Sequence, residues 1–456
     1  MKIKVIFVCY IIIFVCPNIF AYDFKTDGLY YNIIEDGVEV TNDAYNPTNY
    51  SGDLVIPNVV YWEGNSYSVI QIGKYAFESC DSLASVRLSE GIIRIDDYAF
   101  KLCKSLENIV LPSSLEKIGK EAFGGCYNLK SIHIPENVNS ISPDCFIYCS
   151  ILSNITVSPN NKYYNDGYGS NCIIRKDDDT LVIGTTKSQI PDNIQIIGKQ
   201  AFHGRDSLKN IVLPKKLIRI EGSAFCDIEG LISIHIPKSV KNINSTAFIG
   251  CKKLSDISVD SDNPYYYDEN GSNSIIDKRN NTLVVGGNLT IIPNSVDTIG
   301  KDAFCVRGDI QEVAIPNSVK KIGRLAFSDC YSLRKVIIPD SVTEIGMWAF
   351  ASDSVLTDVW LPKCLKKIEY GIFLECTNLK VINIPPNVTE IIWGAFEDCS
   401  GIRKVYSYLE DPIPASYYRY SLDFKKCTLY VPKGTKEKYK QVEPWNTFGS
   451  IIEMDE

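Results

Sequence analysis

A phenylalanine, usually preceded by alanine, recurs every 23 residues through most of this chain. The series is Phe77, Phe100, Phe123, Phe146, Phe202, Phe225, Phe248, Phe304, Phe327, Phe350, Phe373 and Phe396. Its two breaks, 146 to 202 and 248 to 304, each span 56 residues, so units of 23, 23 and 56 form a super-repeat of 102. A period this short predicts a solenoid, because each unit can bury its apolar face only against its neighbours.

One unit, residues 105–126, predicts the path of a single coil. Residues 108–111 alternate and are rich in β-formers, which indicates a short strand, and Pro112 ends it because proline cannot donate to a sheet ladder. Gly119 permits a bend, and Ala122-Phe123 then enters the core. Strands of successive units should pair in parallel, so we expect one continuous parallel sheet along the solenoid.

The two 56-residue units carry an insertion with a pattern of its own. Residues 154–184 match residues 256–286 at an offset of 102, including Tyr163-Tyr164 with Tyr265-Tyr266. Apolar segments alternate with polar turns inside each insertion. We therefore predict two β-hairpin insertions in the coil.

The ends of the chain depart from the repeat. Residues 1–21 have the form of a secretory signal peptide, with two lysines before an apolar run that is too short for a typical membrane anchor. Residues 22–70 predict a β-rich N-terminal cap, residues 71–406 the repeat solenoid, and residues 407–456 a C-terminal cap. Such caps are needed because an open apolar end would aggregate. We expect no transmembrane segment in the mature chain.

Eight cysteines stand three residues after a repeat phenylalanine and should form a column. Side chains on stacked coils are parallel and about 4.8 Å apart, whereas a disulfide requires Cβ atoms nearer 3.8 Å. We therefore expect buried thiols in this column, with the off-column cysteines left open as candidates for pairing. Cysteine is missing from the column at Ile228, Arg307 and Asp353, which should weaken it.

The consensus of the units, IP-x-S-V-x-x-I-G-x-x-A-F-x-x-C-x-x-L, is carried almost whole by residues 315–333. It resembles the BspA-like subfamily of bacterial leucine-rich repeats, over residues 71–406. The resemblance implies a curved right-handed solenoid and, more loosely, adhesion to host proteins or other cells. It brings no shared catalytic residues.

Candidate catalytic and metal-binding residues are few. His133 and His235 occupy the same repeat position and are expected to face outward, and His203 has no evident acidic or cysteine partner. The acidic turn that begins at Asp262 has Asn273, not glutamate, at the twelfth position of a calcium loop. We therefore predict no enzyme activity, no cofactor and no metal site.

Charge limits the class of partner. The formal net charge is −8 and becomes −10 when the two lysines of the leader are removed. Neutralising phosphates requires clustered Lys and Arg, so nucleic acid is not expected as a partner.

The outward residues of the predicted strands vary from unit to unit, which marks this face as the candidate binding surface. The residues that we single out are Arg87, His133, His235, Ile337, Trp360, Asn383 and Tyr406. The last third of this face is apolar and aromatic, and Trp and Tyr are enriched at binding hot spots.

Three functions are compatible with these observations. The first is a secreted or surface-displayed binding module, adhesin-like, for host or bacterial macromolecules, with a protein of the host extracellular matrix or the bacterial surface, or a glycan, as its partner. The second is a structural surface or matrix protein without a specific ligand. The third is a glycan-binding accessory protein that stacks Trp360 and Tyr406 on sugar rings.

Overall fold

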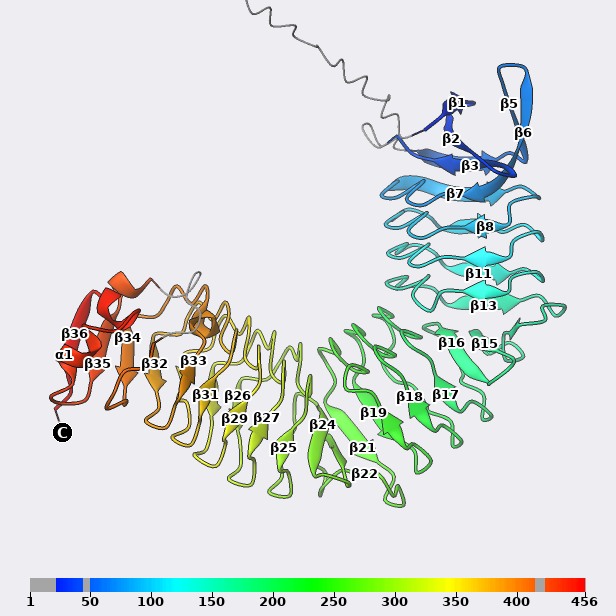
Figure 1. Cartoon of the computed structure of the whole chain (residues 1–456). Coiled ribbons are helices and arrows are strands. Elements are labelled where there is room, and N and C mark those ends of the chain that lie inside the picture. Colours follow the sequence, from blue (N-terminus) through cyan, green and yellow to red (C-terminus); the bar gives the residue numbers. More distant parts are fainter. Residues whose placement is uncertain (1–21, 44–49, 415–422, 456) are drawn as a thin grey trace, which may run out of the picture.

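The computed structural model describes residues 22–43, 50–414 and 423–455, and in this part the chain forms a curved coil of stacked turns (Figure 1). The predicted leucine-rich-repeat solenoid with hairpin insertions and β-rich ends is confirmed. The expected signal peptide, residues 1–21, lies outside the described residues. None of the described helices has the length and hydropathy that a membrane crossing requires.

Two sides of each coil carry strands. The first ladder is formed by the strands that precede the repeat prolines: β4 (Ser51–Ile56), β7 (Ser82–Leu88), β9 (Asn108–Val110), β11 (Ser131–Ile134), β13 (Asn154–Val157), β19 (Ser233–Ile236), β21 (Asp256–Val259), β26 (Glu312–Ala314), β28 (Lys335–Ile337), β30 (Asp358–Val359), β32 (Val381–Ile384) and β34 (Lys404–Ser407). From β7 onward, neighbours within each segment pair in parallel with an offset of 23 residues, as His133 pairs with Thr156, whereas β4 pairs with β7 at an offset of 31 to 32. Along these strands exposed and buried residues alternate, so each strand turns one face to the core.

The second ladder consists of two-residue strands that precede the bend of each coil: β8 (Arg94–Ile95), β10 (Lys117–Ile118), β12 (Ser140–Ile141), β17 (Ile196–Ile197), β18 (Arg219–Ile220), β20 (Asn242–Ile243), β25 (Thr298–Ile299), β27 (Lys321–Ile322), β29 (Glu344–Ile345), β31 (Lys367–Ile368) and β33 (Glu390–Ile391). In each of them an isoleucine enters the core.

The expectation of one continuous parallel sheet is wrong. The first ladder is divided into sheets such as β11-β13, β19-β21 and β26-β28-β30, and the second ladder is divided as well. The second ladder breaks after β12 and after β20, where antiparallel hairpin strands enter. The buried core is divided at the same two places, into clusters that meet within the first insertion and within the second.

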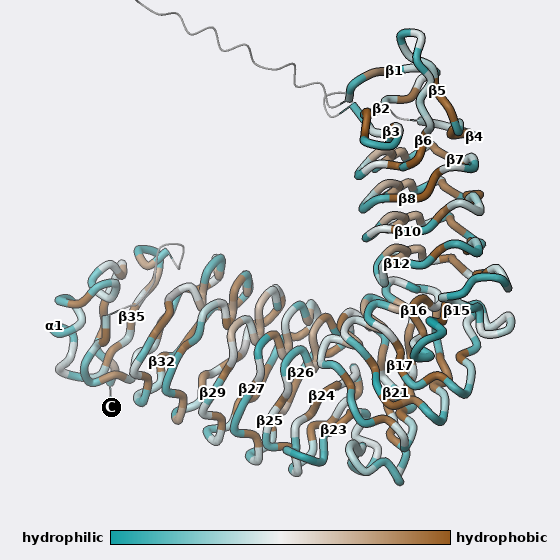
Figure 2. Tube along the Cα trace, turned by 45° about the vertical axis from the view of Figure 1, so that its right-hand side comes forward, coloured by the Kyte–Doolittle hydropathy of each residue, from teal (hydrophilic) through white to brown (hydrophobic). Residues whose placement is uncertain are grey.

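The third side of each coil is the turn around its repeat phenylalanine, called here the Ala-Phe turn. Within each run the phenylalanine rings stack with centroids 4.8–6.0 Å apart and planes within 16°. Backbone hydrogen bonds join neighbouring turns, as from Phe77 N to Ala99 O at 2.8 Å and from Phe100 N to Ala122 O at 2.8 Å. The colouring of Figure 2 shows the apolar segments recurring from coil to coil.

The cysteine column consists of buried thiols that form no disulfide, as predicted. After Cys80, each thiol of the column donates to the carbonyl oxygen of the phenylalanine one coil earlier, as from Cys103 Sγ to Phe77 O at 3.1 Å and from Cys126 Sγ to Phe100 O at 3.2 Å. Thirteen of the fourteen cysteines among the described residues are buried, and Cys364 is exposed. The thiol therefore gives a second hydrogen bond to a buried carbonyl oxygen that also accepts a backbone N–H of its own turn, as Phe77 O does from Cys80 N.

The two insertions widen one side of the coil only. The first forms β14 (Tyr164–Asn165), β15 (Cys172–Arg175) and β16 (Thr180–Gly184); the second forms β22 (Tyr266–Tyr267), β23 (Ser274–Asp277) and β24 (Thr282–Gly286). On the opposite side the Ala-Phe turns stay adjacent, since Tyr148 N donates to His203 O at 3.4 Å. Extra strands on one side and none on the other act as a wedge, and the coil changes direction at the first insertion (Figure 1).

Arginine replaces cysteine in the column just after each insertion. Arg205 is fully buried and donates to Gly184 O at 3.0 Å and to Phe146 O at 2.8 Å. Arg307 makes the same contacts, to Gly286 O at 2.8 Å and to Phe248 O at 3.0 Å. The longer side chain reaches the phenylalanine carbonyl across the inserted strands.

The predicted gaps in the column are therefore not all weak points. Arg307 fills its position, and Asp353 Oδ1 accepts a hydrogen bond from Cys330 N at 2.8 Å. Burial raises the pKa of the Asp353 carboxyl well above its usual range, which favours the neutral form.

Both ends of the solenoid are closed by added strands. At the N-terminus β1 (Phe24–Thr26), β2 (Leu29–Ile34) and β3 (Gly37–Thr41) pair antiparallel, and β5 (Val59–Trp62) pairs with β6 (Asn65–Ile72). At the C-terminus β35 (Thr428–Val431) and β36 (Ser450–Glu453) extend the first ladder in parallel. Helix α1 (Lys436–Tyr439) and the turn at Trp445 cover the end of the core with two fully buried aromatic rings.

We predict that Arg307→Met destabilises the chain by about 2–5 kcal/mol, because it removes the charge-assisted hydrogen bonds that Gly286 O and Phe248 O accept at a buried position. Arg334→Met is the matched control, since Arg334 is exposed, and it should change stability by less than about 0.5 kcal/mol. Chemical denaturation followed by circular dichroism measures both. Equal effects of the two substitutions would show that the buried arginine does not hold the second insertion in place.

Candidate functional site

The seven residues predicted as a binding face all lie on or beside the first ladder, but they do not form one site. Arg87, His133, His235 and Ile337 are exposed on β7, β11, β19 and β28. They are separated along the coil by the breaks in the ladder. Trp360, Asn383 and Tyr406 come together near the C-terminal end.

The histidines show two different situations. His133 Nδ1 lies 2.9 Å from Thr156 Oγ1 and His235 Nδ1 lies 3.0 Å from Ser258 Oγ, so the same exposed cross-strand contact occurs in both copies of the super-repeat. His203 differs from the prediction, because Asp227 Oδ2 lies 3.1 Å from its Nε2. The expected absence of an acidic partner for His203 is therefore wrong.

Three aromatic rings follow one another on the outer face of the last coils. Trp360 and Tyr406 have ring centroids 6.0 Å apart, and Tyr406 stacks on Tyr430 at 4.6 Å with planes 12° apart. Trp360 is 51% exposed, whereas Tyr406 is partly buried. Trp360 thus offers the most open aromatic face of the row.

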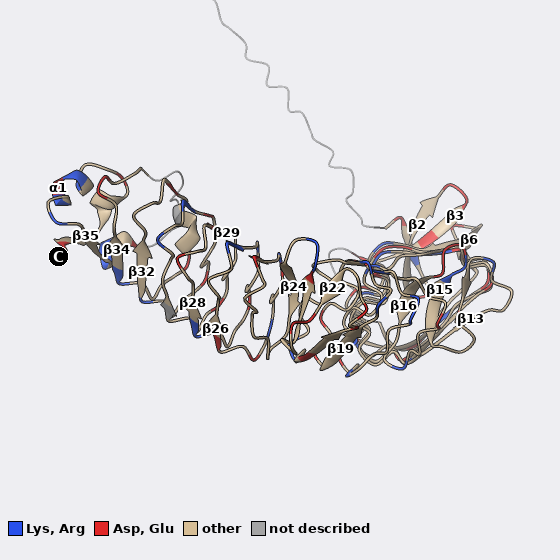
Figure 3. Cartoon of the chain, turned by 90° about the horizontal axis from the view of Figure 1, so that it is seen from below, with Lys and Arg blue, Asp and Glu red and all other residues tan. Residues whose placement is uncertain are grey.

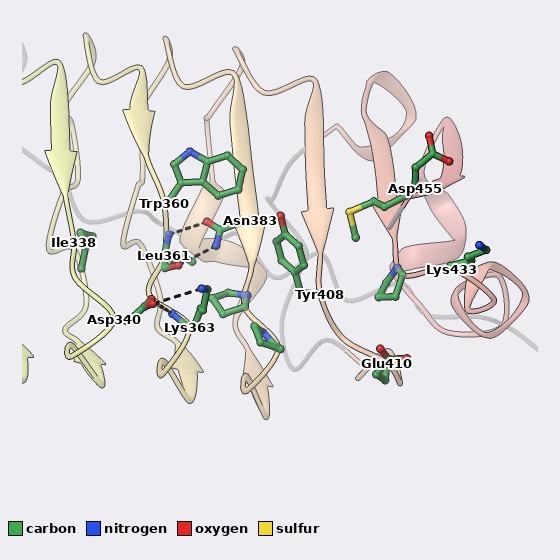
Figure 4. Close-up of a pocket in the computed structure, with 14 residues that line it drawn as sticks. Ile338, Asp340, Trp360, Leu361, Lys363, Asn383, Tyr408, Glu410, Lys433 and Asp455 are labelled. Carbon is green, nitrogen blue, oxygen red and sulfur yellow. Dashed lines mark hydrogen bonds and ion pairs between the residues drawn. The ribbon is translucent and has the colours of Figure 1, made fainter.

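Asn383 does not face outward, contrary to the prediction. It is 6% exposed, and its side-chain amide accepts from Leu361 N at 2.7 Å and donates to Leu361 O at 2.9 Å. Trp360 and Tyr406 belong to the coils on either side, and their rings approach each other above it. Figure 4 shows Trp360 beside Asn383 and the two hydrogen bonds that join the Asn383 side chain to the backbone of Leu361.

A groove of about 600 Å³ runs across the last coils beside this aromatic row. Its position follows from the repeat, because most of its lining comes from the residues just after successive first-ladder strands. The lining residues are Ile338, Asp340, Trp360, Leu361, Lys363, Asn383, Pro385, Pro386, Tyr408, Glu410, Pro432, Lys433, Met454 and Asp455.

The lining is chiefly apolar, and in Figure 4 its charged side chains lie around the edge, with Glu410 below and Lys433 and Asp455 on the C-terminal side. Trp360 and Tyr408 are exposed, with Pro385 and Met454 nearby. Lys363 is tied to Asp340 by a backbone hydrogen bond of 2.8 Å and an ion pair of 3.7 Å. This arrangement can bind an apolar or aromatic group by burial and leave polar contacts to the rim.

Over the rest of the surface the charges are mixed. Figure 3 shows acidic and basic side chains along the whole coil. Several pair between adjacent coils, as Lys104 with Asp81 at 2.9 Å and Lys130 with Glu107 at 2.7 Å. Exposed pairs of this kind contribute at most about 1 kcal/mol each.

Sequence reasoning missed most of the groove. Tyr408 and Pro385 follow their strands by one residue and lie outside the traced column. Pro432, Lys433 and Met454 belong to the C-terminal cap, where the 23-residue period no longer applies. Tyr408 and Pro385 could have been found by following the repeat at the positions after the strands as well as at those within them.

We predict that Asn383→Leu destabilises the chain by about 2–4 kcal/mol, because the N–H and C=O of Leu361 both lose their partner at a buried position. The matched control is Asn387→Leu, which removes the 2.9 Å bond from an exposed asparagine to Lys363 O. Water can replace that bond, so the control should lose no more than about 1 kcal/mol in the same urea titration. If Asn383→Leu left the free energy of unfolding unchanged, the hydrogen bonds to Leu361 would not be stabilising.

No curated protein matches this sequence, whereas several solved structures are similar to the chain. The chain is similar to solved structures of a leucine-rich cell surface protein from Faecalibacterium prausnitzii (23% identity, 95% of each chain covered, TM-score 0.46) and the pneumococcal vaccine antigen PcpA (16% identity, 95% of this chain and 98% of that one, TM-score 0.48). A leucine-rich-repeat protein from Bacteroides ovatus is also similar (24% identity, 90% and 100% covered, TM-score 0.37).

The family model described as the BspA type leucine rich repeat region matches residues 66–176, 183–296 and 286–403. These segments cover more than half of the chain, and they coincide with the coils that carry the Ala-Phe turns. The chain therefore belongs to the BspA-type leucine-rich-repeat family.

Proposed function

We propose that this chain is a surface-displayed leucine-rich-repeat protein that binds an extended segment of a partner protein in the groove beside Trp360. The observation that carries the proposal is Trp360 itself, a half-exposed indole ring above a groove lined by proline, tyrosine and methionine. Large aromatic side chains next to an apolar pocket are the usual anchors of protein interfaces.

The size of the groove favours an extended peptide. It crosses the coils of Ile338, Trp360, Asn383, Tyr408, Pro432 and Met454. Six coils at about 4.8 Å span about 24 Å, which corresponds to about seven residues of extended chain at 3.3 Å each. A partner with an aromatic or proline side chain at its centre and charged residues near its ends matches the lining.

The chemistry of the groove favours peptide over sugar. A glycan needs several open polar groups around its stacking platform, because each hydroxyl must exchange a water for a protein partner. Beside Trp360, the Asn383 amide is already bonded to Leu361, and Asp340 is bonded to Lys363. The row of Trp360, Tyr406 and Tyr430 is the observation that favours glycan stacking as the second candidate.

Display at the surface is part of the same proposal. Residues 1–21 have the pattern of an export signal, and one similar structure is a cell surface protein by its title. A groove for a macromolecule is useful only where the macromolecule is present, so an exported chain and an open binding face are consistent with each other.

The test is a selection of binders to the chain from residue 22 onward, using a random peptide display library and a glycan array in parallel. We expect a saturable peptide ligand with an aromatic or proline core. Trp360→Ala should weaken its binding at least about 30-fold, a loss of about 2 kcal/mol as at a hot spot.

Val212→Ala is the control, because Val212 occupies the same outward position and is 86% exposed, but lies far from the groove along the coil. It should leave binding unchanged, and both variants should unfold within about 1 kcal/mol of the parent. A glycan ligand lost with Trp360→Ala would favour the second candidate. If Trp360→Ala left the affinity for the selected ligand unchanged, binding at this groove would be contradicted.

A further inference from the structure

We propose that His203, Cys226 and Asp227 form a zinc-binding site on the Ala-Phe side of the coil, at the first insertion. A ring nitrogen of His203, the Sγ of Cys226 and a carboxylate oxygen of Asp227 all lie within 4.8 Å of one another. The 3.1 Å between His203 Nε2 and Asp227 Oδ2 is close to the ~3.3 Å that two ligands at ~2.0 Å from a tetrahedral zinc ion would have.

The repeat itself places these three side chains together. His203 follows Phe202 and Cys226 follows Phe225, so they occupy the same position in adjacent turns, 23 residues apart. Asp227 takes a left-handed backbone conformation with φ of 52°. Its carboxylate lies against Gly250, where an added Cβ would stand 2.0 Å from Asp227 Oδ1. The absence of a side chain at Gly250 thus leaves space for this carboxylate.

The cluster is buried at its base and open at one side. His203 is 9% exposed and Cys226 is 8% exposed, while the Asp227 side chain retains 35% of its surface. The Nδ1 atom of His203 is buried and has no hydrogen-bond partner among the described residues. The other ring nitrogen, Nε2, is the one that faces Asp227, so Nε2 is the atom that would bind the ion.

Tyr148 completes the surroundings of the cluster. Its hydroxyl donates to Asp227 Oδ2 at 2.7 Å, and its ring packs edge-on against His203 with centroids 4.8 Å apart. Hydrogen bonds to a ligating carboxylate orient it and support metal affinity. Tyr148 comes from the coil before the insertion, so it acts as a positioning residue across the bend.

The donor set selects the metal. Imidazole, thiolate and carboxylate together suit Zn²⁺, whereas Ca²⁺ and Mg²⁺ prefer oxygen ligands alone. Three protein ligands leave the fourth tetrahedral position to water. On binding, the ion displaces the thiol proton of Cys226, which leaves to solvent, and no oxidation or reduction is involved.

The super-repeat contains its own comparison. At an offset of 102 residues the three positions are Cys305, Ser328 and Asp329, so the second copy has no histidine and only one of the three original ligand types in place. The full donor set therefore occurs in one of the two copies of the super-repeat. A zinc ion here would join the Ala-Phe turns just after the first insertion, where the coil changes direction.

The experiment is a Co²⁺ titration of the metal-free chain from residue 22 onward, followed by displacement with Zn²⁺ and by calorimetry with Zn²⁺ alone. We expect one equivalent of Co²⁺ to give visible bands of tetrahedral cobalt and a near-ultraviolet thiolate-to-cobalt band, and Zn²⁺ to raise Tm. Cys226→Ser should abolish the thiolate band, and His203→Ala should weaken Zn²⁺ binding at least about 100-fold, more than an outer partner does. Tyr148→Phe should weaken it about 10-fold.

Cys305→Ser is the matched control, because it removes a buried thiol at the same turn position as Cys226 but without a histidine neighbour. It should leave the spectrum and the affinity unchanged. Circular dichroism of each variant shows whether the coil is intact. The proposal is overturned if intact parent protein binds no Co²⁺ or Zn²⁺ with saturation, or if Cys226→Ser and Cys305→Ser behave alike.

Discussion

The stacked phenylalanine rings of the Ala-Phe turns are the interaction on which the rest of the structure depends. Within each run the ring of the next coil helps to bury each phenylalanine, and loss of one such side chain costs about 3–5 kcal/mol in a packed core. Within a run the stack fixes the spacing of the coils, and the strands on the other two sides follow that spacing. Between the runs, the buried Arg205 and Arg307 join the coils on either side of each insertion.

The insertions show how a strict repeat is bent without being broken. Added strands on one side push the coils apart there, while adjacent Ala-Phe turns keep their contact on the other side. The carbonyl of the phenylalanine before the insertion then lies beyond the reach of a cysteine in the next coil. Arg205 and Arg307 donate to this carbonyl instead. Cysteines and arginines of the column thus make the same contact, and the longer side chain is used where the distance is greater.

The period predicted the features that depend on stacking and missed those that depend on neighbours outside the period. The phenylalanine series and the cysteine column could be placed coil by coil, because identical residues face each other. Asn383 was assigned to the outer face by register alone, but a short amide can turn back to Leu361 while the larger Trp360 and Tyr406 cover it. The groove also depends on Met454 and the cap, where no repeat guides the prediction.

The partners of His203 were also missed, although the 23-residue period places one of them beside it. The residue 23 positions after His203 is Cys226, so a search across coils, instead of along the chain, finds the pair directly. Partners in a solenoid are neighbours at the repeat distance. Candidate sites in such chains are best sought in the columns.

Hydroxyl-radical footprinting of the chain with its tightest selected peptide tests the binding groove most directly. Trp360, Tyr408 and Met454 in the groove are oxidisable, and so are Tyr61 and Tyr168, which are 72% and 106% exposed and lie outside it. A peptide bound across the groove predicts protection of the first three side chains and unchanged oxidation of the two tyrosines. Protection elsewhere, with Trp360 still fully oxidised, would contradict a binding site at this end of the solenoid.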